Sequence, residues 1–452
     1  MASTYLSRTL GTPTNAYKGT LSYWQKGAST TATNYILACE SGSERMLFYL
    51  TQGKFQAGLR GTSSPPDIDF TVSGLPRFRD VSAWYHVVLA WDSTQSTASD
   101  RMKLYVNGVQ YTWSGSGTSG VNDVPQNHVM PMNKSGLPFR IGSTIAGGSY
   151  FEGIMSHIHF CDGTQYQASD FGETDSTTGE WKIKTDPSVT YGNNGFWWLK
   201  DTNAATDSSP NSNTPTISGT LTKTEDCPSN VFATLNTLCI RTQMIGSSGN
   251  ISYTNGNNTT SNIDASYSTY NVSTLGMQES GKYYCEFKIN AEGSASNSEA
   301  FGISNLNNFN NYPFGSSSGY SYNKDGSGTP SGSGFPSYTT NDIIGVAFDT
   351  GNGNLWFSKN GTWINNATIS EIGSGDNTNA VFTGISTSET WHFSGTTYDN
   401  GGFSANFGNG YFGTTAVATN SGNGYAGAEG SSIFNYQPPT GYTALSTKGL
   451  NL

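Results

Sequence analysis

The sequence has few charged residues for its length. They make up 12% of the 452 residues, and 22 basic side chains face 32 acidic ones, which gives a net charge of −10. A protein that binds nucleic acid neutralises phosphates with clustered Lys and Arg, and no such cluster occurs. We therefore expect no nucleic-acid partner.

Long apolar stretches are missing as well. No apolar run approaches the roughly 18 to 20 residues that a membrane-spanning helix needs. Residues 1–8 contain no basic segment followed by apolar residues, which is the pattern of a secretory signal peptide. The sequence thus predicts no signal peptide and no membrane insertion.

Cysteine is scarce, and its spacing matches no metal site. An odd number of Cys, several of them inside apolar segments, is typical of buried, reduced thiols. We expect these thiols to stay unpaired, and we expect no metal and no other cofactor. The five residues are Cys39, Cys161, Cys227, Cys239 and Cys285.

Helical periodicity is also absent. No window of eleven or more residues keeps a 3.6-residue apolar repeat free of glycine clusters, and the chain contains 55 Gly. Short strands joined by polar turns produce this profile, so the sequence predicts an all-β protein with very little helix.

Two β-hairpins with the same plan are the strongest positive signal. Residues 342–363 contain an apolar segment that ends in an aromatic residue and Asp, then a loop, then a segment that leads to Asn360-Gly361. Residues 84–108 repeat this plan up to Asn107-Gly108. Asn-Gly accepts positive φ at both central positions of a tight turn. The repeat predicts two related β-domains.

The first strand of each hairpin is almost continuously apolar, over residues 87–91 and 343–348. A strand of this kind is buried on both faces in the middle of a sheet. Each domain therefore needs a second layer.

Motifs in the first 170 residues stand in the order of a known fold. They are Thr20–Lys26, Trp84–Val88, Leu104–Gly108 and Phe151–Phe160, followed by Asp162-Gly163. This part of the chain resembles a laminin-G-like domain, an antiparallel jelly roll of the concanavalin A type.

The second half has its own ordered motifs. They are Gly281–Ile289, Ala300–Ser304, the 342–363 hairpin, and Ala405–Gly408 with Phe412. This half resembles a SPRY domain, which is also a concanavalin A-like sandwich. The predicted fold is all-β, with two concanavalin A-like jelly-roll sandwiches in tandem: residues 1–170, a polar connector at 171–235, and residues 236–452.

The connector carries a further resemblance. Its motifs are Ser169–Glu173, Thr178–Trp181, Tyr191–Phe196, Asp207–Asn211 and Ser229–Asn236, and the terminal motif is Tyr436–Leu445. They resemble segments that recur in virion proteins of tailed, especially marine, phages. The resemblance implies a virion protein that folds in the host cytoplasm and is released by lysis. It also implies other virion proteins as partners and a homo-oligomer, trimers being common in such appendages.

Several carboxylates are candidates for catalytic or calcium-binding groups. Asp67-Ile-Asp69 is the nearest match to the alternating carboxylates of a glycan hydrolase, but it lacks a Glu partner, and we expect no enzyme. Acidic residues of the connector and the segment Asp207–Asn213 offer oxygens for calcium, with a solvated loop as the preferred interpretation. The acidic residues are Asp170, Glu173, Asp175 and Glu180.

We expect three histidines to serve the fold rather than to bind a metal. His157-x-His159 places two imidazoles on one face of a strand, which could hold a metal if a third ligand were near. We interpret them as a partly buried pair. His86 lies in an apolar strand, and we expect it to satisfy a core hydrogen bond.

Aromatic residues in the loops of the second half are the candidate ligand-binding residues. Flat rings stack on sugar C–H faces and on partner chains, while packing inside the protein is the alternative for any one of them. The candidates are Tyr312, Phe314, Tyr320, Tyr322 and Tyr338.

Three functions remain open. The first is a phage virion structural protein (a fibre, appendage or decoration subunit) that acts in assembly and contacts a host-surface glycan or protein. The second is a bacterial carbohydrate-binding or adhesion protein. The third is a polysaccharide-cleaving enzyme.

Overall fold

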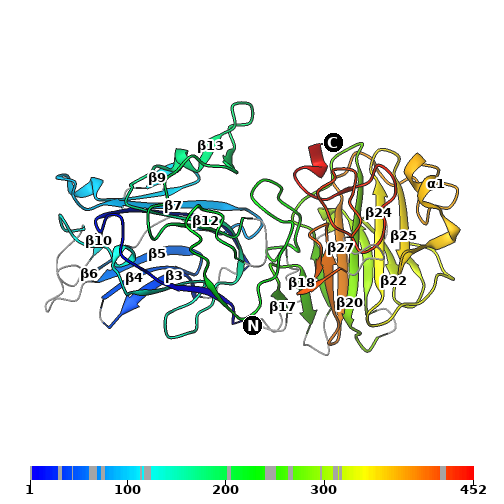
Figure 1. The fold of residues 1–452 in the computed structure, drawn as a ribbon. Coiled ribbons are helices and arrows are strands. Elements are labelled where there is room, and N and C mark those ends of the chain that lie inside the picture. The colour runs from blue at the N-terminus through cyan, green and yellow to red at the C-terminus, as the bar shows by residue number, and fades with distance from the viewer. Residues whose placement is uncertain are drawn as a thin grey trace. The chain divides into compact units, whose positions relative to one another are not determined.

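The computed structural model describes most of the chain. It covers residues 3–451 except 29–32, 43, 61–68, 73–76, 112–114, 117–123, 201–204, 240–250, 263–267, 296–297, 309–313, 315–317 and 418–423. The chain divides into two compact units, residues 1–223 and 224–452. Each unit contains two β-sheets with its own apolar core (Figure 1).

The first unit contains an eight-stranded sheet with strand order β10-β6-β5-β4-β3-β11-β1-β16, and all neighbours are antiparallel. The strands are β1 (Tyr5–Thr9), β3 (Thr33–Ser41), β4 (Glu44–Thr51), β5 (Lys54–Arg60), β6 (Asp69–Val72), β10 (Gly115–Ser116), β11 (Pro138–Ile141) and β16 (Thr216–Ser218).

A six-stranded antiparallel sheet with order β15-β12-β2-β7-β8-β9 faces the first one. Its strands are β2 (Lys18–Gly27), β7 (Tyr85–Asp92), β8 (Met102–Val106), β9 (Val109–Tyr111), β12 (Gly153–Asp162) and β15 (Phe196–Trp198). Phe139 of one sheet stacks on Phe196 of the other with ring centroids 5.6 Å apart, so the core lies between the sheets.

The far face of the six-stranded sheet is also covered. A second apolar cluster there joins Val88, Tyr105 and Trp197 of the sheet to Phe171 and Tyr191. The cover includes the hairpin of β13 (Gly172–Thr174) and β14 (Trp181–Ile183), which is drawn above β7 in Figure 1. Much of the segment predicted as a polar connector therefore packs within the first unit.

The second unit repeats the two-sheet plan. One sheet has the order β17-β18-β28-β20-β24-β25-β26, with β31 parallel to β20, and the other has the order β19-β27-β21-β22-β23. The strands of the first are β17 (Ile251–Thr254), β18 (Thr259–Asn262), β20 (Lys282–Ala291), β24 (Ile343–Asp349), β25 (Asn354–Lys359), β26 (Thr362–Trp363), β28 (Gly402–Asn406) and β31 (Thr443–Ala444). Those of the second are β19 (Ser268–Val272), β21 (Ala300–Ser304), β22 (Gly319–Asn323), β23 (Gly328–Thr329) and β27 (His392–Tyr398).

Helix is nearly absent from the described residues. They contain one α-helix, α1 (Ile369–Ser374), which begins with a capping box between Thr368 and Glu371. The rest is a small β29 (Tyr411–Phe412) and β30 (Thr415–Ala416) hairpin and six short 3-10 turns. These turns are η1 (Ala98–Asp100), η2 (Pro131–Asn133), η3 (Ala168–Asp170), η5 (Leu306–Asn308), η6 (Ile364–Asn366) and η7 (Gly449–Asn451). Within the described part of the chain, no helix is long and apolar enough to cross a membrane.

Candidate functional site

The aromatic residues predicted to bind a ligand are mostly buried. Phe314, Tyr322 and Tyr338 are exposed by 2%, 0% and 1%, so their rings cannot stack on a ligand. The half-buried Tyr320 packs against the rings of Phe382 and Trp391 at centroid distances of 5.2 and 5.7 Å. Tyr322 and Tyr338 face the core of the sandwich and Phe314 is buried, so the structure places none of the three at an exposed stacking surface. Tyr312 lies outside the described residues.

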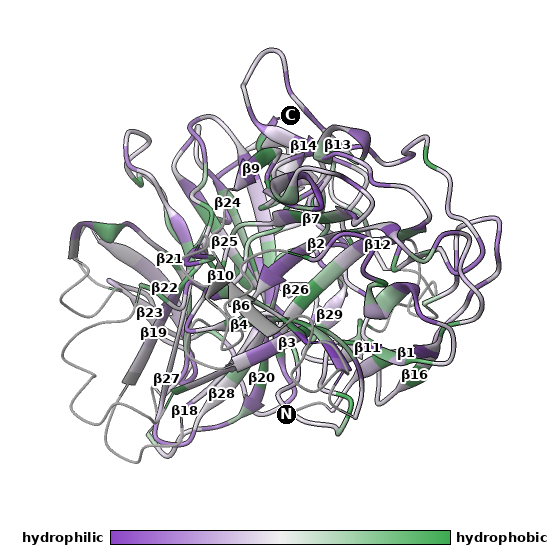
Figure 2. Cartoon of the chain, turned by 90° about the vertical axis from the view of Figure 1, so that its left-hand side faces the viewer, coloured by the Kyte–Doolittle hydropathy of each residue, from purple (hydrophilic) through white to green (hydrophobic). Residues whose placement is uncertain are grey.

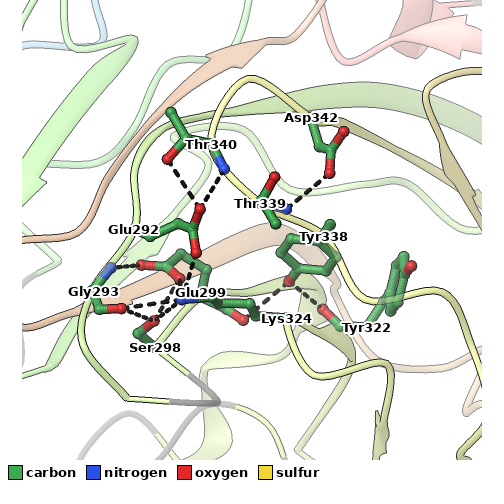
Figure 3. A network of polar contacts seen from close by, with 10 residues as sticks. All are labelled: Glu292, Gly293, Ser298, Glu299, Tyr322, Lys324, Tyr338, Thr339, Thr340 and Asp342. Carbon is green, nitrogen blue, oxygen red and sulfur yellow. Dashed lines mark hydrogen bonds and ion pairs between the residues drawn. The ribbon is translucent and has the colours of Figure 1, made fainter.

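Two of these tyrosines support a polar network instead (Figure 3). The Tyr338 hydroxyl donates toward the backbone carbonyls of Glu299 and Tyr322, at 3.0 and 2.9 Å. The fully buried Glu299 carboxylate accepts from the Gly293 amide at 2.7 Å and lies 3.6 Å from the Lys324 ammonium. The network holds the exposed loop 330–341 to the end of the sandwich.

The network also contains two carboxyl groups with opposite pKa shifts. Burial raises the pKa of Glu299, whereas the Thr340 amide and the Lys324 ammonium lower the pKa of Glu292. Such pairs mark acid and base in some enzymes. Here Glu299 is fully buried and its oxygens accept protein hydrogen bonds, so a substrate cannot reach it without displacing them. The geometry fits a structural clamp.

Removal of one hydroxyl tests this clamp. We expect Tyr338→Phe to destabilise the second unit by about 1–3 kcal/mol, because the buried carbonyls of Tyr322 and Glu299 each lose a hydrogen bond, and Glu299 keeps only the one from the Lys324 amide. Urea unfolding followed by circular dichroism measures the change, and Tyr17→Phe, at a position that is 36% exposed, is the matched control. An unchanged midpoint would contradict the structural role.

Two of the carboxylates that could serve as calcium ligands, Asp207 and Asp175, accept hydrogen bonds from the protein instead. Asp207 accepts from the amides of Trp197, Ser209 and Asn213 at 2.8, 2.9 and 2.5 Å, which closes its own loop. Asp175 accepts two amides of the β13–β14 turn and pairs with Lys182 at 3.2 Å. Both arrangements match the interpretation as loops. Asp67 lies outside the described residues.

The histidines form an internal polar and aromatic cluster. His157 and His159 are 8% and 3% exposed, with a β-bulge between Ser156 and His159, and His157 has a φ of 47°. Nδ1 of His159 forms a hydrogen bond with the Tyr191 hydroxyl at 2.9 Å. Among the described residues, no group of three or more His, Cys, Asp or Glu is arranged to hold a metal.

His86 makes the core hydrogen bonds that the sequence predicts. Its Nδ1 accepts from the Trp181 indole at 3.0 Å, and its Nε2 lies 2.8 Å from Ser22 Oγ. An indole N–H only donates, so Nε2 must carry the proton and donate to Ser22. Trp24 stacks on the imidazole at 4.7 Å. The neutral tautomer is fixed by its surroundings, and burial lowers the pKa of His86 to about 3.

A different surface carries half-buried aromatic and charged side chains. It is the outer face of the eight-stranded sheet in the first unit, where the strand register aligns residues in rows. Tyr35, Tyr49 and Gln56 form one row across β3, β4 and β5, which we call the tyrosine row. The two tyrosine rings stack at 5.0 Å with an angle of 17°.

A parallel row on the same face carries charge. Glu40, Arg45 and Arg60 are cross-strand partners, and all three are half-buried. A line of small or compact residues, Ala38, Leu47 and Gly58, separates this row from the tyrosine row. Figure 2 shows hydrophilic and hydrophobic residues mixed along β3.

This face was not predicted from the sequence. Its residues come from strands separated by turns, and only the register of β3, β4 and β5 aligns them. The available signal was alternation, since Tyr35, Arg45, Tyr49 and Gln56 occupy outward positions between buried ones. Single-strand motifs cannot show which outward positions become neighbours.

The comparisons agree with the all-β architecture. Residues 3–169 match the family model Laminin_G_3, described as the concanavalin A-like lectin/glucanases superfamily. No curated protein matches the chain.

Similar solved structures have low identity. The SPRY domain of human HERC1 is 17% identical, with a TM-score of 0.27, over 34% of this chain and 91% of that one. A heptameric SAP-like pentraxin from Limulus polyphemus is 19% identical, with a TM-score of 0.25, over 36% and 71%. The CBM40 of the Ruminococcus gnavus IT-sialidase, bound to α2,3-sialyllactose, is 18% identical, with a TM-score of 0.23, over 32% and 73%. By its family match, the N-terminal part of the chain, residues 3–169, is a concanavalin A-like domain of the laminin-G type.

Proposed function

We propose that this chain is a structural protein of a tailed-phage virion, a fibre, appendage or decoration subunit. It acts in assembly and binds a glycan on the host surface. The resemblance of its connector and C-terminal segment to phage virion proteins supports the virion role. The tandem sandwiches support a scaffold that presents a binding surface.

The outer face of the eight-stranded sheet carries the binding half of the proposal. Stacked, half-buried Tyr35 and Tyr49 offer flat apolar area, on which the C–H faces of sugars can pack. Gln56 in the same row and Arg45 in the next offer donors that can bind hydroxyl groups. Apolar rings beside a few polar groups are typical of binding sites.

Substitution of the two tyrosines tests the site. We expect Tyr35→Ala combined with Tyr49→Ala to weaken binding to purified cell-surface polysaccharide about tenfold or more, because the stacking surface is lost. Calorimetric titration measures the affinity. Tyr17→Ala removes a more exposed tyrosine of the same unit and serves as the control. Equal affinity of the double variant and the control would refute this site.

The virion role has a separate test. Antibodies against the chain should label particles from the same source in electron micrographs, and the chain should co-sediment with them. A chain that is never found on purified particles is not a virion component, whatever it binds.

The same face would also suit a bacterial carbohydrate-binding or adhesion protein. Neighbouring genes for portal, capsid and tail proteins would argue against that alternative.

We propose binding without catalysis. Incubation with host polysaccharide should therefore release no new reducing ends, and their appearance would favour the polysaccharide-cleaving alternative.

A further inference from the structure

Glu286 is a fully buried carboxylate in the second unit. It lies on β20, in the middle of a sheet, and its side chain is on the face opposite the main core. Four donors surround it: the amides of Asn435 and Tyr436 at 2.8 and 2.7 Å, Asn406 Nδ2 at 3.1 Å and the Tyr284 hydroxyl at 3.2 Å.

The two amide donors belong to the C-terminal strap, which we define as residues 424–449. The strap covers this face of the sheet, and Phe434 packs edge-on against the Tyr284 ring at 4.9 Å. Its strand β31 pairs with β20 over only two residues, Thr443 and Ala444. Isolated backbone hydrogen bonds, such as those from the Ile433 amide to Gly408 and from the Ala233 amide to Leu445, also hold the strap, and the apolar contacts and the Glu286 carboxylate add to this attachment.

Among the residues that the structure describes, no cation forms an ion pair with this carboxylate. Lys288 follows Glu286 on the same face of β20 but forms no ion pair with it in the described part of the chain. Lys282, on the same face, donates to the Gly373 carbonyl at 2.8 Å and lies 3.8 Å from Asp349. A buried charge without a partner is costly. Burial accordingly raises the pKa of Glu286 to about 7, although the four donors act in the opposite direction.

The surroundings can also accept a protonated Glu286. The cross-strand neighbour of Glu286 is Gly345, and the next residue in that row is Ser358. A Cβ on Gly345 would lie 2.4 Å from Ser358 Oγ and 2.7 Å from the Tyr284 hydroxyl, so these two groups meet over the glycine. Ser358 Oγ is buried beside the Tyr284 hydroxyl, within reach of a hydrogen bond from it. The Tyr284 O–H can therefore turn to Ser358 and accept the Glu286 proton.

We infer that the C-terminal strap is a pH-sensitive latch whose docking on the sheet is controlled by protonation of Glu286. The docked strap holds a buried carboxyl, and the released strap exposes it to water. The neutral carboxyl fits the docked state without an uncompensated charge. Docking is therefore strongest in mildly acidic solution and weakens as the carboxyl ionises.

The direction of this pH dependence follows from the linkage between strap docking and proton binding by Glu286. The pKa of Glu286 is about 7 with the strap docked, against 4.5 for an ordinary Glu. The docked state thus binds the proton more tightly, and its advantage is complete below about pH 4.5. The opening constant of the strap should rise by up to roughly tenfold per pH unit between these values, and level off above pH 7. The other groups facing Glu286, namely Tyr284, Tyr436, Asn406 and Ser358, carry no charge in this range.

Hydrogen exchange of the full chain tests the latch. Amides in residues 433–436 and 442–446 are followed from pH 5 to pH 8, and their opening constants are corrected for intrinsic exchange. We expect opening to increase with pH in the wild type and to be independent of pH in Glu286→Gln, which mimics the neutral carboxyl. Glu279→Gln, at an exposed position of the same unit, should behave as the wild type.

A second variant keeps the test decisive if Glu286→Gln does not fold. Ser358→Ala removes the acceptor for the reoriented Tyr284 hydroxyl and so disfavours the protonated docked state, and the rise in opening should level off at a lower pH than in the wild type. A flat wild-type profile, or an unchanged profile in a folded Glu286→Gln variant, would overturn the inference. Neither result depends on glycan binding or on the presence of the chain in a virion.

Discussion

A chain that ends at residue 170 is expected to lose cooperative unfolding of the first unit, whereas a chain that ends at residue 223 should keep it. The shorter chain lacks β15, the outermost strand of the six-stranded sheet, and β16, which pairs with β1. It also lacks Phe196 and Trp198, both fully buried in the core between the sheets. Differential scanning calorimetry and near-ultraviolet circular dichroism of the two chains measure this difference.

The single substitution Trp198→Ala isolates the main part of the effect. Trp198 stacks on Phe196 and Phe139, and its indole donates to the Asn213 carbonyl at 2.9 Å. We expect the free energy of unfolding of the first unit to fall by about 3–5 kcal/mol, because removal of a large buried ring leaves a cavity. Tyr17→Ala is the control, since that ring is 36% exposed. A cooperative transition in the chain ending at 170, together with a small effect of Trp198→Ala, would contradict this view of the unit.

The hairpins were predictable from the sequence because their signals are local. The structure confirms β24 and β25, and all seven residues of β24 are buried, as a continuously apolar central strand requires. Asn360 and Gly361 have φ angles of 51° and 80°, and Asn107 and Gly108 have 47° and 80°. These positive values belong to the tight Asn-Gly turn that the sequence indicates.

The surface proposed to bind a ligand was harder to predict because burial is not local. Tyr322 and Tyr338 stand in segments rich in Gly and Ser, which indicate an exposed loop, yet their rings meet at 5.0 Å inside the sandwich. Tyr35 and Tyr49 lie in apolar strands, yet they face outward. Strand pairing decided both outcomes, because alternation within one strand indicates outward positions but not which residues become neighbours or which are covered.

The apolar cover of the sheets was missed for a related reason. Trp181 belongs to a segment rich in Asp, Glu, Thr and Gly, which reads as a polar loop. Its indole nevertheless lies against Gly108 and Gly172, where an added Cβ would come within 2.5 Å of the ring. Two glycines from distant segments create the space, so the contact is visible only after folding.

Acid is expected to destabilise the first unit through the histidines that this cover encloses. The pKa of His86 is about 3 in the folded state, lowered by burial from an ordinary value of 6.5. Burial lowers the pKa of His159 as well, and repulsion between its protonated form and the neighbouring basic groups His157, His86 and Lys200 adds to the shift. The unfolded chain therefore binds protons more readily than the folded one. The stability contributed by each neutral ring is complete above about pH 6.5 and is lost as the pH falls toward the folded pKa.

Through His86, the free energy of unfolding of the first unit should fall by about 1 kcal/mol per pH unit below pH 6.5. Urea midpoints of the chain ending at residue 223, measured from pH 7.5 to pH 4, give the slope. His86→Phe should be less stable at pH 7.5, because Ser22 and Trp181 lose their partner, but its slope should be smaller. His128→Gln, at a half-buried histidine of the same unit, should keep the wild-type slope. An unchanged slope in His86→Phe would show that the acid sensitivity arises elsewhere. A reduced slope would mean that a neutral imidazole, held between Trp24 and Trp181, links the cover to the sheet.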